Sequence, residues 1–600
     1  MTFRSFNIGM TSLQATQLML DTTGHNVANA TTPGYSRQRV NTEANKPQPY
    51  GNVAVGTGVL VNDITSITDV FLEQQVRVAT STYGQLNQKN TGYENLEAYF
   101  NELTGNDIST TFSNFWDALD DLNDHVEDLS TRANAASVAQ TFAESVQSTR
   151  QKIYDYRANQ NHVIVETVGT VNEVCAQIAS LNAAIMKMES SGATGVKAND
   201  LRDQREVLVK QLSGLMDVNV SEEKNGSLIV AQHGRMLVFE NQTFELTTTR
   251  VERGGLMVDD IVFAADRAKV VMADGAVYGM VQMRDVVALS YQNDLDQFAG
   301  EVIWNFNRQF SQGVGLTGLS EMTADYRIID PAVTLDKLQY EFTPQANTFQ
   351  IKDGVFEVIV YDVNSGEAKH VPIDIDLTSS ADDKRTILYS TEAVETAPGV
   401  WTYNQPENSL VRKMQDAFDS VAAGAFTVSL DKLNRVSIVA NSESTQFAFG
   451  RDDTGVLAAL GLNTFFSGNN AQTITVNQTM QDNPQLFAAA DAFVDGNQIN
   501  IRSLTHMRIE TTMKNGTASF EDFYNGVVGR LGIESARTAS LFSAQADIKV
   551  SVENQRESLS GVNMDEEMTK MSQYLTAYKA SSQFISVVNQ MFDSLLSIVR

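Results

Sequence analysis

The sequence predicts an α+β multidomain protein, with long α-helical, coiled-coil-like terminal and inner domains formed by both chain ends and with inserted mainly β domains. Three observations predict this fold class. Apolar residues recur at helical spacing at both ends, prolines are absent from long stretches, and β-branched runs separated by turn residues occupy interior segments. A chain of 600 residues is too long for one hydrophobic core, so we expect three or more domains.

The C-terminal segment from Met564 onward has the clearest helical pattern. Asn563 is placed as an N-cap, and Glu566 three residues later would complete a capping box. The stripe repeats every ~3.5 residues, which is the spacing of a helix that packs on another helix in a coiled coil. Its positions are Met564, Met568, Met571, Leu575, Tyr578, Ser582, Ile585, Asn589, Phe592, Leu596 and Val599.

A weaker stripe of the same spacing occupies the N-terminal segment. It consists of Phe6, Met10, Leu13, Gln17, Leu20, Gly24 and Val27, and it ends at Thr32-Pro33-Gly34. Both chain ends are almost neutral: residues 1–40 hold three basic and one acidic residue, and residues 541–600 hold five basic and seven acidic residues. We therefore expect the two stripes to pack together, which would make the chain ends one composite domain rather than two unrelated surface helices.

The prolines indicate where the domains divide. None lies between residues 50 and 330 or between 485 and 600, and long helices need proline-free chain. We expect a composite terminal helical assembly domain of residues 1–60 and 556–600. A mostly helical domain of residues 61–335 and 485–555 would contain a small β element at 218–278. Residues 336–484 would form an inserted, mainly β outer domain, with its clearest strands at 356–361, 426–430 and 435–439.

Composition excludes several functional classes. A net charge of -29 and a pI near 4.6 argue against binding to nucleic acid or to an anionic membrane surface. The C-terminal helix is too polar between its apolar positions for membrane insertion, and no stretch reaches eighteen apolar residues. The single cysteine, Cys175, lies in an apolar seam and excludes an internal disulfide and a cysteine-rich zinc site.

The search for catalytic chemistry gives no candidate. The six histidines are scattered, and the sequence has no P-loop, no G-x-S-x-G elbow and no H-E-x-x-H motif. We therefore expect no catalytic residue, no cofactor-binding residue, no metal site and no enzymatic activity.

Three segments resemble known proteins. Residues 26–38, Asn-Val-Ala-Asn-Ala-Thr-Thr-Pro-Gly-Tyr-Ser-Arg-Gln, resemble the N-terminal signature of the axial proteins of the bacterial flagellum, namely the rod, hook and hook-associated proteins. The C-terminal run from Ser560 to Met568, followed by Ala577–Ser581 and Met591–Leu596, is similar to the end of the hook-associated members that form the junction between hook and filament. The helical run Asp200-Leu-Arg-Asp-Gln-Arg-Glu-Val-Leu-Val favours the same branch of the family.

The resemblance implies a structural protein that polymerises at the hook tip through paired N- and C-terminal helices. It implies a homo-oligomer in the flagellar axial structure, with hook protein and the second hook-filament junction protein as neighbours. A flagellar export chaperone and the type III export apparatus would deliver the chain outside the cell without a cleavable signal peptide. The expected assembly interface comprises Phe6, Met10, Leu13, Leu20, Val27, Asn29, Pro33, Gly34, Tyr35, Met564, Met568, Met571, Leu575, Tyr578, Ile585, Phe592, Leu596 and Val599.

Three alternatives remain open from the sequence. They are the hook protein itself, a secreted adhesin that binds through residues 340–480, and a hydrolase with an unrecognised site. Long tubes formed by the purified protein would favour hook protein, a ligand for the isolated 340–480 region would favour the adhesin, and activity lost on substituting one carboxylate would favour the hydrolase.

Overall fold

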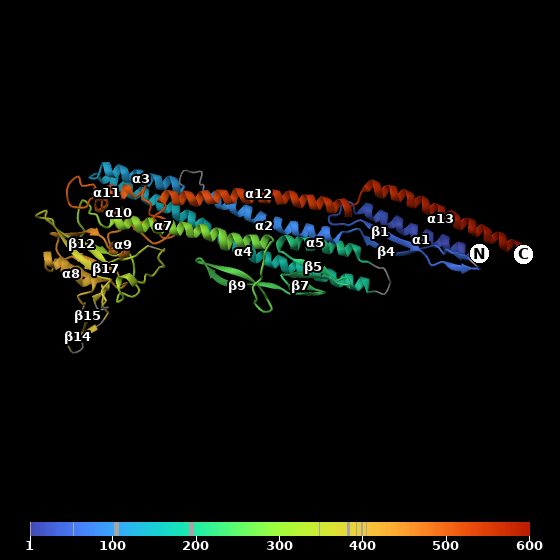
Figure 1. Ribbon diagram of the computed structural model, residues 1–600, viewed down its shortest axis with the longest axis horizontal. Coiled ribbons are helices and arrows are strands. Elements are labelled where there is room, and N and C mark those ends of the chain that lie inside the picture. Colours follow the sequence, from blue (N-terminus) through green and yellow to red (C-terminus); the bar gives the residue numbers. More distant parts are fainter. Residues whose placement is uncertain are drawn as a thin grey trace. The chain divides into compact units, whose positions relative to one another are not determined.

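The computed structural model describes residues 2–51, 53–100, 107–190, 197–346, 348–380, 384–391, 393–397, 400–403 and 405–599. It confirms the predicted α+β class, because long helices occur at both chain ends and the strands form several small sheets (Figure 1). The chain divides into two compact units. Unit 1 contains Met1–Glu94, Arg157–Val287 and Ser535–Arg600, and unit 2 contains Asn95–Tyr156 and Ala288–Glu534.

In unit 1, the chain ends form an antiparallel pair of helices, α1 (Thr2–Ala28) and α13 (Met564–Val599), and both termini lie at the same end of this pair (Figure 1). The expected pairing of the terminal helices is therefore observed. Strand β1 (Gln38–Ala44) pairs antiparallel with β4 (Val59–Ser66), with a register shift between Asn41 and Thr42. Between them, β2 (Gln48–Tyr50) and β3 (Val53–Val55) form a short hairpin.

The rest of unit 1 is built on helices and two small sheets. Parts of three long helices belong to it, α2 (Val70–Phe100), α4 (Leu129–Glu189) and α12 (Phe520–Ser560). The shorter helices are α5 (Asn199–Leu215), α6 (Ala276–Gln282) and the π-helix η1 (Met283–Val287). The predicted small β element consists of β5 (Asn219–Glu222), β6 (Leu228–Gln232), β7 (Arg235–Phe239), β8 (Gln242–Thr243), β9 (Leu246–Arg253) and β10 (Leu256–Phe263). Its core includes Cys175, which is buried as expected.

Unit 2 combines helices with a β-rich segment. Its helices are α3 (Ile108–Asp124), α7 (Ala288–Phe310), α8 (Leu410–Val421), α9 (Val456–Leu460), α10 (Gln478–Asp482), α11 (Ile499–His506), η2 (Leu335–Lys337) and η4 (Pro484–Leu486). Its strands are β11 (Glu321–Thr323), β12 (Gly354–Asp362), β13 (Ala368–Ile375), β14 (Ala393–Ala397), β15 (Val400–Tyr403), β16 (Phe426–Leu430), β17 (Val436–Ala440), β18 (Thr445–Asp452), β19 (Phe466–Ser467) and β20 (Thr475–Val476).

The sheets of unit 2 are antiparallel. Two of them have three strands, in the orders β11-β17-β16 and β13-β12-β18. The three strands predicted with most clarity are present as β12, β16 and β17. The division into domains of residues 1–60 with 556–600, 61–335 with 485–555, and 336–484 stays a prediction. Among the helices described, none has the length and apolarity that a membrane span requires.

Candidate functional site

The contact between α1 and α13 is made by small and polar residues of α1. Ser12 Oγ lies 2.8 Å from Ser581 Oγ, and Asn26 Nδ2 donates to Glu567 Oε2 at 2.9 Å. A Cβ atom on Gly9 would stand 2.7 Å from Cγ1 of Ile585. That the N-terminal apolar stripe itself packs on α13 stays a prediction. Small residues such as Gly9 let the two backbones approach closely.

The C-terminal stripe divides between a covered face and an exposed face of α13. Met571, Tyr578, Ile585 and Phe592 are half-buried, whereas Met564, Met568, Leu575 and Leu596 are 46%, 54%, 45% and 62% exposed. On α1, Met10 is exposed and Phe6, Leu13, Leu20 and Val27 are half-buried. The side chain of Val599 lies outside the part of the chain that the structure describes. Which of these residues contact neighbouring copies stays a prediction.

Four exposed apolar residues of α13 were missed by the sequence analysis. Phe584, Val587, Met591 and Leu595 are about as exposed as the stripe residues Met564 and Leu575. Their spacing of three or four residues is itself a helical stripe, and it lies on the other flank of the covered face. Contiguous apolar surface of this kind marks protein interaction sites, so α13 offers apolar surface on two flanks.

The buried side chain of Asn26 holds the segment that resembles the flagellar signature. Asn26 is 1% exposed; its Oδ1 accepts from Tyr35 Oη at 2.8 Å and from the Gln38 backbone N at 2.9 Å. Its Nδ2 donates to the Gln38 carbonyl oxygen and to Glu567, each at 2.9 Å. One amide thus connects α1, the loop of residues 29–35, strand β1 and α13. We call residues 29–35 the signature loop.

A second set of contacts ties Ser36 and Arg37, which directly follow the signature loop, to α5 and α12. The Ser36 backbone N donates to Asp203 Oδ2 at 2.9 Å, and the Arg37 backbone N donates to the Ser560 carbonyl oxygen at 2.7 Å. Arg37 also forms an ion pair with Glu566 at 2.9 Å. Tyr35 is buried within its own chain, so in a single copy its role is to position the loop.

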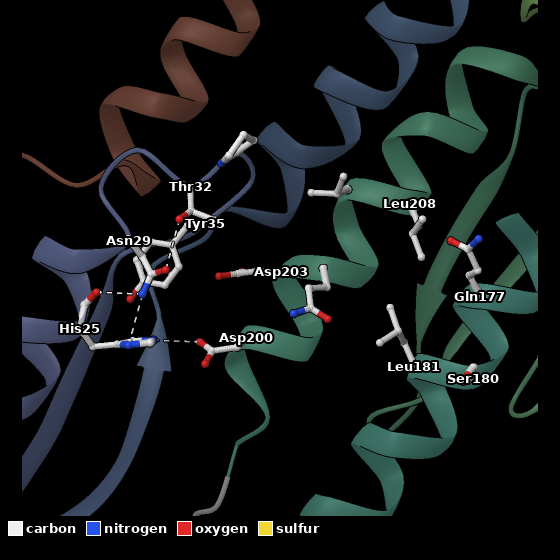
Figure 2. A pocket seen from close by; sticks show the side chains of 13 residues that line it. His25, Asn29, Thr32, Tyr35, Gln177, Ser180, Leu181, Asp200, Asp203 and Leu208 are labelled. Carbon is white, nitrogen blue, oxygen red and sulfur yellow. Dashed lines mark hydrogen bonds and ion pairs between the residues drawn. The ribbon is translucent and has the colours of Figure 1, made fainter.

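A cavity of about 640 Å³ opens beside the signature loop. Figure 2 shows His25, Asn29, Thr32 and Tyr35 on one side of it and the helical residues Gln177, Ser180, Leu181 and Leu208 opposite, with Asp200 and Asp203 between them. His25 Nε2 lies 3.3 Å from Asp200 Oδ1, and Asn29 Nδ2 lies 3.3 Å from His25 Nδ1. The described residues contain no cluster of histidine, cysteine and carboxylate side chains suited to a metal ion.

The pH dependence of this region should follow from Asp203. Burial raises the pKa of Asp203 to about 6, while hydrogen bonds from Ser36 and the charge of Arg556 act in the opposite direction. The folded state therefore holds the proton more tightly than the unfolded chain, in which the pKa is about 3.9. The free energy of opening the loop should fall by up to about 2–3 kcal/mol as the pH rises from about 4 to about 6.

The change of this opening free energy with pH can be measured by amide hydrogen exchange of Ser36 and Arg37. The exchange rates are first corrected for their intrinsic pH dependence. In Asp203→Asn the titrating group is absent, so the opening free energy should no longer depend on pH in this range. A slope that persists in this variant would assign the pH dependence to another group.

Position 34 requires glycine for two reasons, its backbone angle and the closeness of a neighbouring side chain. Its φ is +80°, which favours glycine, and a Cβ atom there would overlap Cγ2 of Val207 on α5. Gly34→Ala should therefore destabilise the loop by about 2–3 kcal/mol. Adding Val207→Ala removes the overlap but not the backbone strain, so it should restore about 1 kcal/mol. Limited proteolysis of the loop in both variants measures the difference, and equal cleavage in the single variant and the wild type would refute the prediction.

Three family models match segments of the chain, and curated relatives match almost all of it. The model "Flagellar hook-associated protein FlgK helical domain" matches residues 93–324, "Flagella basal body rod protein" matches residues 6–35, and "Flagellar basal body rod FlgEFG protein C-terminal" matches residues 554–598. Flagellar hook-associated protein 1 of Bacillus subtilis (strain 168) is 24% identical, over 99% of this chain and 98% of the relative. The chain is thus similar to flagellar hook-associated protein 1 from end to end.

Two further relatives are similarly distant. Flagellar hook-associated protein 1 of Escherichia coli (strain K12) is 24% identical, and that of Salmonella typhimurium (strain LT2) is 23% identical, each over 99% of both chains. The solved structure of the flagellar hook junction protein FlgK from Burkholderia pseudomallei is 16% identical, with a TM-score of 0.47, and covers 81% of this chain and 100% of its own. The family is a structural family of the flagellum.

Proposed function

We propose that this chain is a structural component of the bacterial flagellum that forms the junction between hook and filament. Its end-to-end similarity to flagellar hook-associated protein 1 is the observation that carries this proposal. Hook protein and an adhesin that binds through residues 340–480 are not favoured. The relatives that match over 99% of this chain are named flagellar hook-associated protein 1.

The exposed surface of the α1–α13 pair supports a mechanism by which the chain polymerises at the hook tip. The pair leaves apolar side chains of α13 exposed on two flanks, among them Met568, Leu575 and Met591. Neighbouring copies in a tube would cover these side chains, and each Å² of apolar surface removed from water contributes about 25 cal/mol. Many copies can therefore assemble stably even though a single α1–α13 pair buries little apolar surface.

The proposed neighbours follow from this position in the flagellum. The chain would contact further copies of itself, hook protein on one side and the second hook-filament junction protein on the other. A flagellar export chaperone and the type III export apparatus would bring it outside the cell. A chain with a single buried cysteine has no internal disulfide to prevent export in an unfolded state.

Electron microscopy of cells that lack the gene tests the proposed function. We expect complete hooks that carry no filament, with filament protein shed into the medium, because the layer on which the filament grows would be missing. Cells without hooks would indicate a hook protein instead. Filaments of normal length would exclude a role in the junction and leave the adhesin as the alternative.

A further inference from the structure

The cavity beside the signature loop is lined by acidic and apolar side chains that take no part in the pairing of α1 with α13. Asp200 and Asp203 supply negative charge to its lining, and Leu181, Val207 and Leu208 supply apolar surface. Among its described lining residues none is a lysine or arginine. The cavity therefore suits a segment that presents a cation next to apolar side chains.

The β2–β3 hairpin of unit 1 presents such a segment. Tyr50 and Val53 are 48% and 61% exposed, and Lys46 beside them is also exposed. Residues 45–58 contain one charged residue, Lys46, and no acidic residue. The guanidinium of Arg4 lies 5.4 Å from the centre of the Tyr50 ring and adds a second cation. Charge and apolarity of the hairpin are thus complementary to those of the cavity.

One copy cannot place its own hairpin in its own cavity. Tyr50 lies beside Arg4, at the start of α1, whereas the cavity begins at His25 near the end of this helix. The separation of these two positions along α1 is roughly 31 Å, at about 1.5 Å per residue. A contact between hairpin and cavity must therefore join two copies. It would join different surfaces of the two copies, and a repeated contact of this type builds rings or helical tubes.

We propose that the β2–β3 hairpin of one copy docks into the signature-loop cavity of a second copy, with Lys46 directed toward Asp200 and Asp203. The inference rests on the proposed function, because the contact forms only when copies assemble. It gives the signature loop a second role as the receptor of a neighbouring subunit.

Disulfide trapping tests the contact in assembled flagella. Cys175 does not interfere, because it is buried and burial raises the pKa of its thiol to about 12. A chain carrying Val53→Cys and Ser180→Cys should give a ladder of disulfide-linked copies when isolated flagella are mildly oxidised. The matched control combines Val53→Cys with Glu166→Cys on the same helix, roughly 21 Å from Ser180 at about 1.5 Å per residue.

A ladder from the Ser180 pair, absent from the Glu166 pair, would support the docking. Flagella that contain the Ser180 variant without any ladder would overturn it. Absence of the wild-type chain from isolated junctions would instead refute the proposed function.

The ionic part of the contact has its own test. In the Ser180 pair, Lys46→Glu should lower the yield of linked copies about two- to fivefold, the effect of losing an exposed ion pair. Adding Asp200→Lys should then restore the yield. An unchanged yield with Lys46→Glu would remove the ion pair from the proposal.

Discussion

Deleting residues 561–600 should abolish attachment of the filament but leave the rest of the chain folded. Among the residues that the structure describes, two large hydrophobic cores, one around Val171 and Leu212 and the other around Phe356 and Phe418, include no residue of α13. Among the described residues of α13, Val588 is the fully buried apolar one. The deletion therefore removes the exposed apolar surface proposed for assembly at little cost to either core.

The measurement compares purified truncated and full-length chains by circular dichroism and thermal unfolding, and cells that express each chain by electron microscopy. The main unfolding transitions should coincide, while cells with the truncated chain should carry hooks without filaments. A second gene copy that encodes the full-length chain should restore the filaments. Normal filaments on cells with the truncated chain alone would exclude α13 from assembly, and global unfolding of the truncated chain would show that α13 is needed for the fold.

Asn26→Leu should disrupt the composite of the two chain ends more strongly than any surface substitution in α1. The change removes four hydrogen bonds and leaves the Tyr35 hydroxyl and the backbone of Gln38 without their partner. Glu567, which is 2% exposed, would keep Lys570 at 2.8 Å but lose Asn26. Buried groups deprived of partners in this way cost about 3–5 kcal/mol in total.

Hydrogen exchange of the α1 and α13 amides measures the loss of stability in these two helices. A local measurement is needed because a chain with several cores has no single free energy of unfolding. Protection of both helices should fall in Asn26→Leu, whereas protection of the two large cores should not change. Asn7→Leu is the matched control, because Asn7 is exposed on the same helix. If both variants lose the same protection, the network around Asn26 does not hold the chain ends together.

The start of α13 shows how far local sequence rules extend. Asn563 caps this helix as predicted, since its Oδ1 accepts from the backbone N of Asp565 at 3.0 Å and of Glu566 at 3.3 Å. Glu566 was expected to complete a capping box, but its Oε2 pairs with Arg37 of the other chain end. Capping depends on neighbouring residues and is visible in sequence, whereas an ion pair between residues far apart in the chain is not.

The sequence by itself determined that both ends are helices, that these helices pair, that Cys175 is buried and that the chain resembles flagellar axial proteins. These conclusions depend on periodicity, composition and a continuous motif, all of which are local. Only the tertiary structure decided which face of α1 meets α13. Periodicity finds an apolar stripe, but it does not show that Gly9, Ser12 and Asn26 contact α13. Small side chains allow the backbones to approach, and the buried amide of Asn26 finds its carboxylate partner only after the two ends have met.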